Sequence, residues 1–183
     1  MKNTAKNTTQ KLVFSSLLAA LICVATAIIK VPGPLGYIHL GDAPVILAAF
    51  LLPPGYGFLA AGIGSCLADL FSGYAVYAPV TFLIKGGMVL LIRLILGLLR
   101  KKGKPLLAYS LAGVLAELLM VLGYYVFEGI LYGFGAALAS VPFNAVQGVA
   151  GLALGLLLVH VVKKSRIVRF SDTFRTDAEN IKK

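Results

Sequence analysis

Six apolar stretches, separated by short polar or glycine- and proline-rich connections, follow one another along this chain. They cover residues 12–30, 43–53, 56–71, 79–99, 106–127 and 137–162. The first, fourth, fifth and sixth are long enough to span about 30 Å of hydrocarbon as helices. The second and third are short, and Pro53-Pro54-Gly55 between them predicts a tight turn. We therefore predict an all-α, polytopic membrane protein: a bundle of six transmembrane helices in which protein neighbours cover the short second and third spans.

The composition and the charge support lipid as the surrounding solvent. Of the 183 residues, 59% are hydrophobic and 13% are charged, and a soluble domain of this length cannot bury so much apolar surface. The net charge of +10 lies at the ends of apolar stretches. Anchoring to an anionic membrane surface explains that placement better than nucleic-acid binding does.

The basic residues also predict an orientation. They gather before residue 12, at 100–104 and after residue 162, and connections 31–42, 72–78 and 128–140 contain none. The positive-inside rule then places both termini in the cytoplasm. We divide the chain into a cytoplasmic N-terminal tail (1–11), a membrane domain (12–162) and a basic cytoplasmic C-terminal tail (163–183). The first apolar stretch is interpreted as a retained helix rather than a cleaved signal peptide.

Ionisable side chains inside the apolar stretches are candidates for function, because they are costly in lipid. Asp69 and Lys85 are expected near the outer ends of neighbouring helices, where they either form an ion pair or contact a bound solute. Glu117 is expected near the middle of the fifth helix. Arg93 is either its partner or extends toward the inner surface.

Amides and aromatic rings add a second set of candidates. Asn144 and Gln147 stand three residues apart on one helix face, where they either bond a heteroaromatic ring or bond between helices. Tyrosines near the outer side form either an aromatic belt or a stacking surface for a small aromatic solute. We expect connection 31–42 to act as a lid. The predicted solute-binding residues are His39, Asp42, Asp69, Tyr74, Tyr77, Lys85, Glu117, Tyr124, Asn144 and Gln147.

Small residues recur every four positions in the first helix, at Ser15, Ala19, Cys23 and Ala27. Such a stripe lets another helix approach closely, either from this protein or from a partner subunit. The glycines of the third and sixth stretches are expected to serve packing within the chain. Two cysteines in apolar surroundings offer no metal-ligand spacing, so no metal is expected.

Four segments of the chain, taken in order, resemble a known family. They are YIHLGDAP (37–44) with the PPGYG turn (53–57), GSCLADLFSGY (64–74), PVTFLIKG (79–86) and NAVQGVAG (144–151). In this order and spacing they resemble the substrate-binding (S) components of energy-coupling-factor (ECF) vitamin transporters, over residues 12–162. The resemblance implies a six-helix protein of the bacterial cell membrane that captures a vitamin or precursor on the outer side.

The same resemblance implies partners and a branch. The partners are a transmembrane T subunit, which docks on the small-residue stripe of the first helix, and two ATPase subunits that use the ATP, so this chain needs no cofactor. The nearest branch is that of hydroxymethylpyrimidine or vitamin B6 forms, with riboflavin and pantothenate branches as neighbours. The chain has no tryptophan, and its tyrosines, amides and carboxylates favour a one-ring solute.

Two other classes of function stay open beside this one. One is a proton-coupled secondary carrier with Glu117 or Asp69 as the titrating group, although such carriers usually have two related halves and none is visible. The other is a membrane enzyme acting on lipid, which rests only on the spacing of His39 and Asp42. The chain contains neither a Walker lysine motif nor a catalytic constellation, so we interpret it as a binding subunit rather than an enzyme.

Overall fold

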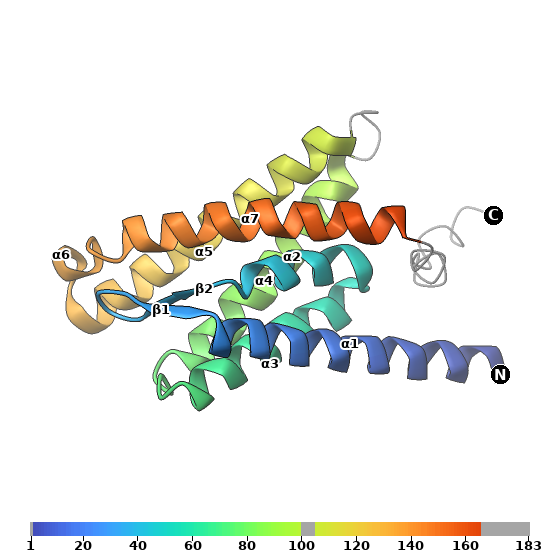
Figure 1. Cartoon of the computed structure of the whole chain (residues 1–183), viewed down its shortest axis with the longest axis horizontal. Coiled ribbons are helices and arrows are strands. Elements are labelled where there is room, and N and C mark those ends of the chain that lie inside the picture. The colour runs from blue at the N-terminus through green and yellow to red at the C-terminus, as the bar shows by residue number, and fades with distance from the viewer. Residues whose placement is uncertain (1, 100–104, 166–183) are drawn as a thin grey trace.

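The computed structural model describes residues 2–99 and 105–165 (Figure 1). The expected basic loop at 100–104 and the C-terminal tail beyond residue 165 lie outside the described residues. The helices are α1 (Lys2–Ile28), α2 (Asp42–Leu51), α3 (Pro54–Phe71), α4 (Ala78–Leu99), α5 (Pro105–Tyr132), α6 (Phe134–Ala137) and α7 (Val141–Lys164). The described part of the chain is mainly helical, as predicted.

Four helical segments are long and apolar enough to cross a membrane: Thr8–Ile28, Ala78–Leu99, Leu107–Tyr132 and Phe134–Lys164. The ten residues of α2 measure about 15 Å as a helix, half of the hydrocarbon thickness. Helix α2 is buried among α1, α3, α4 and α7, so protein neighbours do cover it. That α2 and α3 complete a set of six spans stays a prediction.

A short β-hairpin between α1 and α2 departs from the predicted all-α fold. Strands β1 (Lys30–Pro32) and β2 (Tyr37–His39) pair antiparallel, with Lys30 opposite His39. The Gly33 N–H donates to the Gly36 carbonyl oxygen at 2.8 Å and closes the turn. Strands of three residues are too short for an alternating pattern, which is why the sequence did not indicate them.

Some helix boundaries also differ from the predicted ones. Helix α1 begins at Lys2, so the expected N-terminal tail continues the first helix. Helix α5 runs on to Tyr132, beyond the predicted end at residue 127, and the short α6 precedes α7, which begins at Val141 instead of residue 137. Gly133 has a φ of +88°, a conformation that favours glycine, and it separates α5 from α6.

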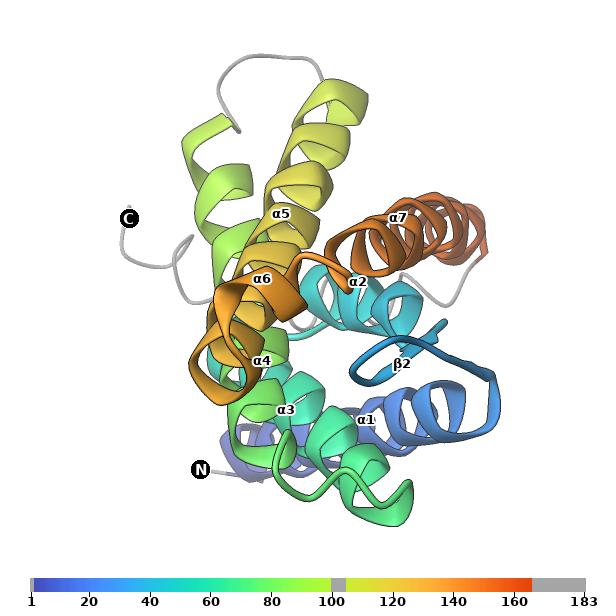
Figure 2. The same cartoon turned by 90° about the vertical axis from the view of Figure 1, so that its left-hand side faces the viewer.

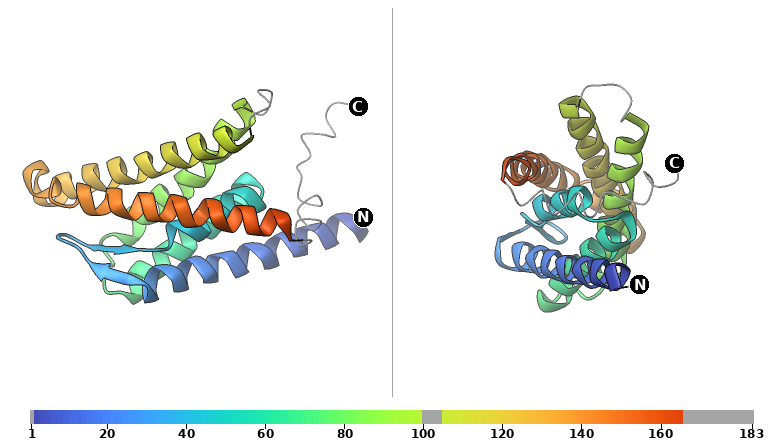
Figure 3. Two further views of the ribbon diagram at one scale, coloured as in Figure 1. Left: turned by 45° about the horizontal axis from the view of Figure 1, so that its top comes forward. Right: turned by 90° about the vertical axis from the view of Figure 1, so that its right-hand side faces the viewer.

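The helices alternate in direction, so the connections gather at two opposite ends of the bundle (Figures 1 and 3). One end holds the start of α1, the end of α4, the start of α5 and the end of α7. The other, which we call the hairpin end, holds β1–β2, the α3–α4 connection (72–77) and α6. Seen from the hairpin end, the strands lie beside α2, between α1 and α7 (Figure 2). This arrangement brings segments distant in sequence around one space.

Glycines allow the closest helix contacts, as predicted for α3 and α7. A Cβ at Gly64 of α3 would lie 2.4 Å from the carbonyl oxygen of Ala19, so α1 and α3 meet backbone to backbone. On α7, a Cβ at Gly155 would lie 2.9 Å from Ile46 of α2. The prediction that these glycines pack helices of the same chain is confirmed.

Candidate functional site

A cavity opens at the hairpin end, with about 480 Å³ of empty space that is partly open to the outside. Its wall is built by the hairpin and by residues of α3, α4, α5 and α7 with their connections. The lining residues are Gly33, Pro34, Gly36, Tyr37, Ile38, His39, Asp69, Tyr74, Tyr77, Thr81, Tyr124, Glu128, Ser140, Phe143, Asn144 and Gln147.

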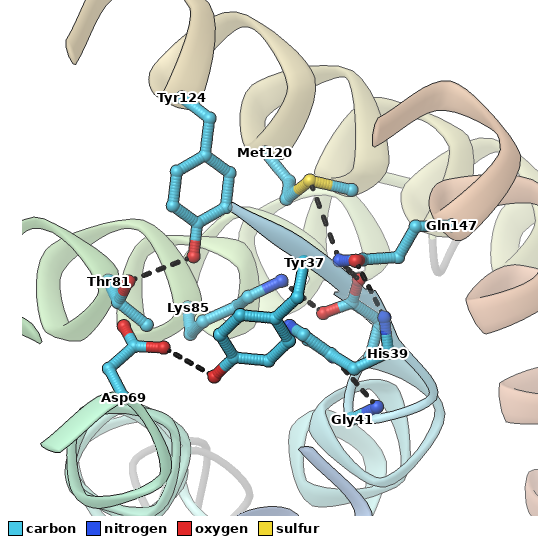
Figure 4. Close-up of polar contacts among 10 residues, drawn as sticks. Tyr37, His39, Gly41, Asp69, Thr81, Lys85, Met120, Tyr124 and Gln147 are labelled. Carbon is cyan, nitrogen blue, oxygen red and sulfur yellow. Dashed lines mark hydrogen bonds and ion pairs between the residues drawn. The ribbon is translucent and has the colours of Figure 1, made fainter. Parts of the chain in front are cut away.

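Four tyrosines form a continuous aromatic row along this wall. The ring centroids of Tyr37 and Tyr74 are 4.8 Å apart, those of Tyr74 and Tyr77 6.0 Å, and those of Tyr77 and Tyr124 6.5 Å. Tyr77 and Tyr124 are buried, and the hydroxyl group of Tyr124 lies 3.0 Å from Thr81 Oγ1 (Figure 4). Fixed aromatic faces of this kind suit the stacking of a flat ring.

Two carboxylates on the wall are each only half satisfied. Tyr37 donates its hydroxyl hydrogen to Asp69 Oδ1 at 2.7 Å (Figure 4), and Tyr77 bonds Glu128 Oε1 at 3.3 Å. Asp69 Oδ2, Glu128 Oε2 and Ser140 Oγ are buried and have no hydrogen-bond partner among the side chains that the structure describes. Buried polar atoms are seldom left unpaired, since each costs about 1–3 kcal/mol. These atoms are therefore points at which a bound solute would be held.

A second polar cluster, which we call the deep network, lies behind this wall. Lys85 forms an ion pair with Asp42 Oδ1, and both side chains are 0% exposed. Gln147 Nε2 donates to Asp42 Oδ2 at 2.7 Å, and Gln147 Oε1 accepts the backbone N–H of His39 at 3.0 Å (Figure 4). The network thus joins α2, α4 and α7 to strand β2.

The predicted ion pair between Asp69 and Lys85 is wrong, because Lys85 bonds Asp42 instead. Lys85 lies seven residues into α4, about 10 Å from the helix end at Ala78. Asp69 lies only two residues from the end of α3. Helix α2 begins deep in the bundle, and its first residue, Asp42, reaches the depth of the ammonium group. Reasoning from sequence had placed both charges at one depth.

His39 is held as a neutral ring. Its Nδ1 accepts the backbone N–H of Gly41 at 3.1 Å, so the ring hydrogen is carried by Nε2. Burial, and then the charge of Lys85, lower the pKa of His39 to about 4. Gly41 is required here, since a Cβ would lie 1.9 Å from Thr26 Oγ1.

Glu117 occupies the interface of α5 and α7 rather than the cavity wall. Its carboxylate faces Gly148 and Gly151, where an added Cβ would come within 3.3 Å and 3.2 Å of its oxygens. Both oxygens are buried, and within residues 8–99 and 107–165 neither has a hydrogen-bond partner. Arg93 was expected either to pair with Glu117 or to extend toward the inner surface. In the structure it is half-buried on α4 and makes no bond to the Glu117 carboxylate.

The structure therefore divides the predicted residues into two groups. Those that line the cavity are His39, Asp69, Tyr74, Tyr77, Tyr124, Asn144 and Gln147. Asp42, Lys85 and Glu117 lie behind the wall. That these residues bind a solute stays a prediction.

Sequence reasoning missed several lining residues: Tyr37, Thr81, Glu128, Ser140 and Phe143. Glu128 carried a usable signal, because it is a carboxylate in a connection without lysine or arginine. Tyr37 lies in connection 31–42, where the sequence alone does not separate a tyrosine of an aromatic belt from one that contacts a solute. Thr81, Ser140 and Phe143 have no sequence signal of their own. In the described part of the chain, His, Cys, Asp and Glu form no group of three that would hold a metal ion.

The small-residue stripe of α1 lies at the edge of the α1–α3 interface. Ser15, Ala19, Cys23 and Ala27 are half-buried, and they flank the buried face formed by Leu18, Ile22 and Thr26. The backbone of Ala19 already contacts α3 at Gly64. The stripe thus serves packing within the chain on one side, while its other side stays accessible.

Comparison with known proteins gives matches over most of the chain. A family model described as "ECF-type riboflavin transporter, S component" matches residues 6–164. A solved structure described as that of the S component of a bacterial ECF transporter superposes with a TM-score of 0.70, at 24% identity, over 86% of this chain and 97% of that one. This structural likeness concerns the fold.

Two relatives are similar in sequence. The chain is 35% identical over 145 residues to an uncharacterized protein in a gap 3' region of Pyrococcus woesei, covering 78% of this chain and 95% of the relative. It is 31% identical over 139 residues to the thiamine precursor transporter HmpT of Lactococcus lactis subsp. cremoris (strain MG1363), covering 75% of this chain and 77% of the relative.

Proposed function

Since the chain belongs to the family of S components of ECF-type transporters, we propose that it captures a small vitamin or vitamin precursor. The members of this family are multi-pass membrane proteins for vitamin uptake. The proposed solute has a single ring, of the hydroxymethylpyrimidine or pyridoxine type. The HmpT relative supports the hydroxymethylpyrimidine branch of the family. The observation that carries the proposal is the tyrosine row beside the unpaired oxygen of Asp69.

The chemistry of the cavity supports this class of solute. A hydroxymethylpyrimidine has a flat ring that stacks on tyrosine, an exocyclic amine that donates hydrogen bonds, and ring nitrogens that accept them. Asp69 Oδ2 is a buried acceptor that suits the amine, and the Asn144 amide both donates and accepts. The solute would thus complete the hydrogen bonding of the wall.

Charge argues against pantothenate as the solute. The carboxylates of Asp69 and Glu128 line the cavity, and its lining contains no lysine or arginine among the described residues. Lys85, the nearest buried cation, is already paired with Asp42. An anionic vitamin would therefore find no counter-charge, whereas a neutral or cationic ring rich in donors is favoured. Riboflavin, which gives the matching family model its name, is kept as the alternative solute.

Transport requires that the cavity open to one side of the membrane and that partner subunits supply the energy. We propose that the hairpin end faces the outside, because the basic positions of the chain concentrate toward the other end. Import would be driven by ATP in two partner ATPase subunits through a T subunit. In this proposal the hairpin at 30–39 acts as a lid, since Gly33, Pro34, Gly36 and Tyr37 form part of the cavity wall. Ligand-dependent protection of this hairpin from chemical labelling tests the lid.

The docking surface for the T subunit is proposed on the accessible side of the α1 stripe. Cys23→Trp should block close helix approach. Co-purification with the partner subunits and uptake should then fall, while the isolated subunit keeps its affinity. Leu12→Trp, at an exposed position of the same helix, is the matched control. An intact complex with Cys23→Trp would remove this surface from the proposal.

The solute proposal is tested by mass spectrometry of small molecules released from the purified protein, followed by calorimetric titration with hydroxymethylpyrimidine, pyridoxine, riboflavin and pantothenate. We expect a pyrimidine or pyridine to bind most tightly. Tighter binding of riboflavin would replace the proposed solute by the alternative one. Uptake that needs a proton gradient and no ATPase partner would instead support a secondary carrier.

A further inference from the structure

The two half-satisfied carboxylates of the cavity wall differ in their surroundings. Asp69 offers one bare oxygen, Oδ2, and the cavity hydroxyl group beside it, that of Thr81, is already paired with the hydroxyl group of Tyr124. Glu128 also offers one bare oxygen, Oε2, and the hydroxyl group of Ser140, just before α7, lies near this carboxylate and has no other hydrogen-bond partner among the described residues. The exposed fractions of Glu128 and Ser140 are only 3% and 4%, so water satisfies neither of them well.

The position of Glu128 is fixed by the tyrosine row. Tyr77 lies within hydrogen-bond distance of both the Leu35 carbonyl oxygen, at 2.8 Å, and Glu128 Oε1, at 3.3 Å. The ring of Tyr77 also packs against Phe127, the neighbour of Glu128 on α5, with centroids 5.2 Å apart. The carboxylate is therefore held against the hairpin and the aromatic wall, with its second oxygen left for another partner.

The two positions demand different chemical groups. A carboxylate oxygen alone accepts hydrogen bonds and suits an amine, which donates them. A carboxylate oxygen beside a serine hydroxyl presents one acceptor together with a group that both donates and accepts. An alcohol matches that pair, because it donates to Glu128 Oε2 while it accepts from Ser140 Oγ.

We propose that Glu128 and Ser140 form a second subsite that binds an alcohol substituent of the solute, while Asp69 binds the ring's donor group elsewhere on the wall. This inference rests on the proposed function, and it identifies the part of the cavity that determines specificity. The subsite makes the protein select the hydroxymethyl form of a ring over the corresponding methyl form.

The test uses matched pairs of compounds that differ in one hydroxyl group. They are hydroxymethylpyrimidine with its analogue carrying methyl in place of hydroxymethyl, and pyridoxine with its deoxy analogue. Affinities are measured by titration calorimetry on the full-length protein and on Glu128→Gln and Ser140→Ala. Wild-type protein should bind the alcohol of a pair about tenfold to a hundredfold more tightly, as expected for a hydrogen bond to a charged group.

Glu128→Gln should abolish most of that preference, because it weakens the binding of the alcohol. The affinity for the methyl analogue should stay within about threefold of the wild-type value. Ser140→Ala should reduce the preference in the same direction by a smaller factor, and it carries the test if Glu128→Gln does not fold. Asp69→Asn is the matched control, because it should weaken both members of a pair equally.

The outcomes separate the two proposals. The alcohol subsite would be overturned if the wild-type protein bound both members of a pair equally, or if the two subsite variants lost affinity for both members equally. The proposed function would still stand in that case. Wild-type protein that binds no pyrimidine or pyridine would overturn the proposed function and the subsite together. A preference that disappears in both subsite variants and persists in Asp69→Asn supports the subsite.

Discussion

The deep network and the cavity wall lie one behind the other in the same bundle, and they differ in how completely their polar atoms are bonded. In the deep network, Lys85, Asp42 and Gln147 satisfy one another and are shielded from solvent. On the wall, Asp69 and Glu128 each keep one buried oxygen without a partner in the part of the chain that the structure describes. Carboxylates thus join helices in the deep network, whereas on the wall they keep the unpaired oxygens that we propose as contacts for the solute.

The difference has a thermodynamic reason. A charge buried among helices must be paired, because its desolvation costs several kcal/mol. The unpaired oxygens of the wall carry a smaller cost of about 1–3 kcal/mol each, which a solute recovers when it binds. Removing a residue should therefore lower stability in the first cluster and affinity in the second.

The largest effect is expected from Lys85→Met. The substitution leaves Asp42 buried without its counter-charge, so the free energy of unfolding should fall by about 3–5 kcal/mol. Thermal or denaturant unfolding in detergent micelles measures the loss. Asp42→Asn combined with Lys85→Met should recover most of it.

The matched double variant is Asp69→Asn with Lys85→Met, which should recover nothing because Asp69 is bonded to Tyr37. If this pair recovered stability and the Asp42 pair did not, the assignment of the ion partner would be incorrect. The contrast between a paired deep network and an unpaired cavity wall would then be incorrect.

A smaller effect, on affinity rather than stability, is expected from Asp69→Asn. The amide loses the charged acceptor for a donor of the solute, so affinity should fall by about 1.5–3 kcal/mol, or tenfold to a hundredfold. The free energy of unfolding should change by less than about 1 kcal/mol. Titration calorimetry and unfolding of the same preparations measure both.

Glu117→Gln sharpens this prediction, because it makes the same chemical change behind the wall. We expect a weaker effect on affinity than for Asp69→Asn, since Glu117 does not line the cavity. Equal losses in the two variants would mean that the solute reaches the α5–α7 interface, and the boundary between the two clusters would have to move.

The smallest effect concerns His39, which bonds the deep network through its backbone and is one of the residues that line the cavity. Its pKa is about 4 in the folded protein and about 6.5 in the unfolded chain, so the unfolded state binds more protons between these values. The contribution of the neutral His39 ring to the free energy of unfolding is fully present above pH 6.5 and is lost as the pH falls toward 4. Between pH 7 and pH 5.5 the free energy of unfolding should decrease by about 1 kcal/mol.

Unfolding curves of the wild type and of His39→Gln at the two pH values check this prediction. The variant should lose the part of the pH dependence that arises from residue 39. An unchanged slope in His39→Gln would show that other groups produce it.

Particular residues explain which parts of the site were predictable. Lys85, Asp69 and Gln147 stood out as polar residues in apolar stretches, and the cost of such groups in lipid identifies them from sequence alone. Glu128, which lies on α5, and Ser140 both fall in the predicted connection 128–140, where polar residues are ordinary. The absence of lysine and arginine there marks Glu128, but only burial in the structure distinguishes Ser140. Tyr37 looked like any interfacial tyrosine until its contact with Asp69 was seen.

The sequence by itself determined the family resemblance, the helical membrane architecture and the long spans, because bilayer thickness limits each span by its length and composition. It also indicated seven of the sixteen residues that line the cavity. Only the tertiary structure decided the ionic partner of Lys85, the two strands of the hairpin and the unpaired oxygens of the wall. These depend on how deep α2 begins and on how the hairpin folds over α3 and α7, and such depths are set by packing between segments that are distant along the chain.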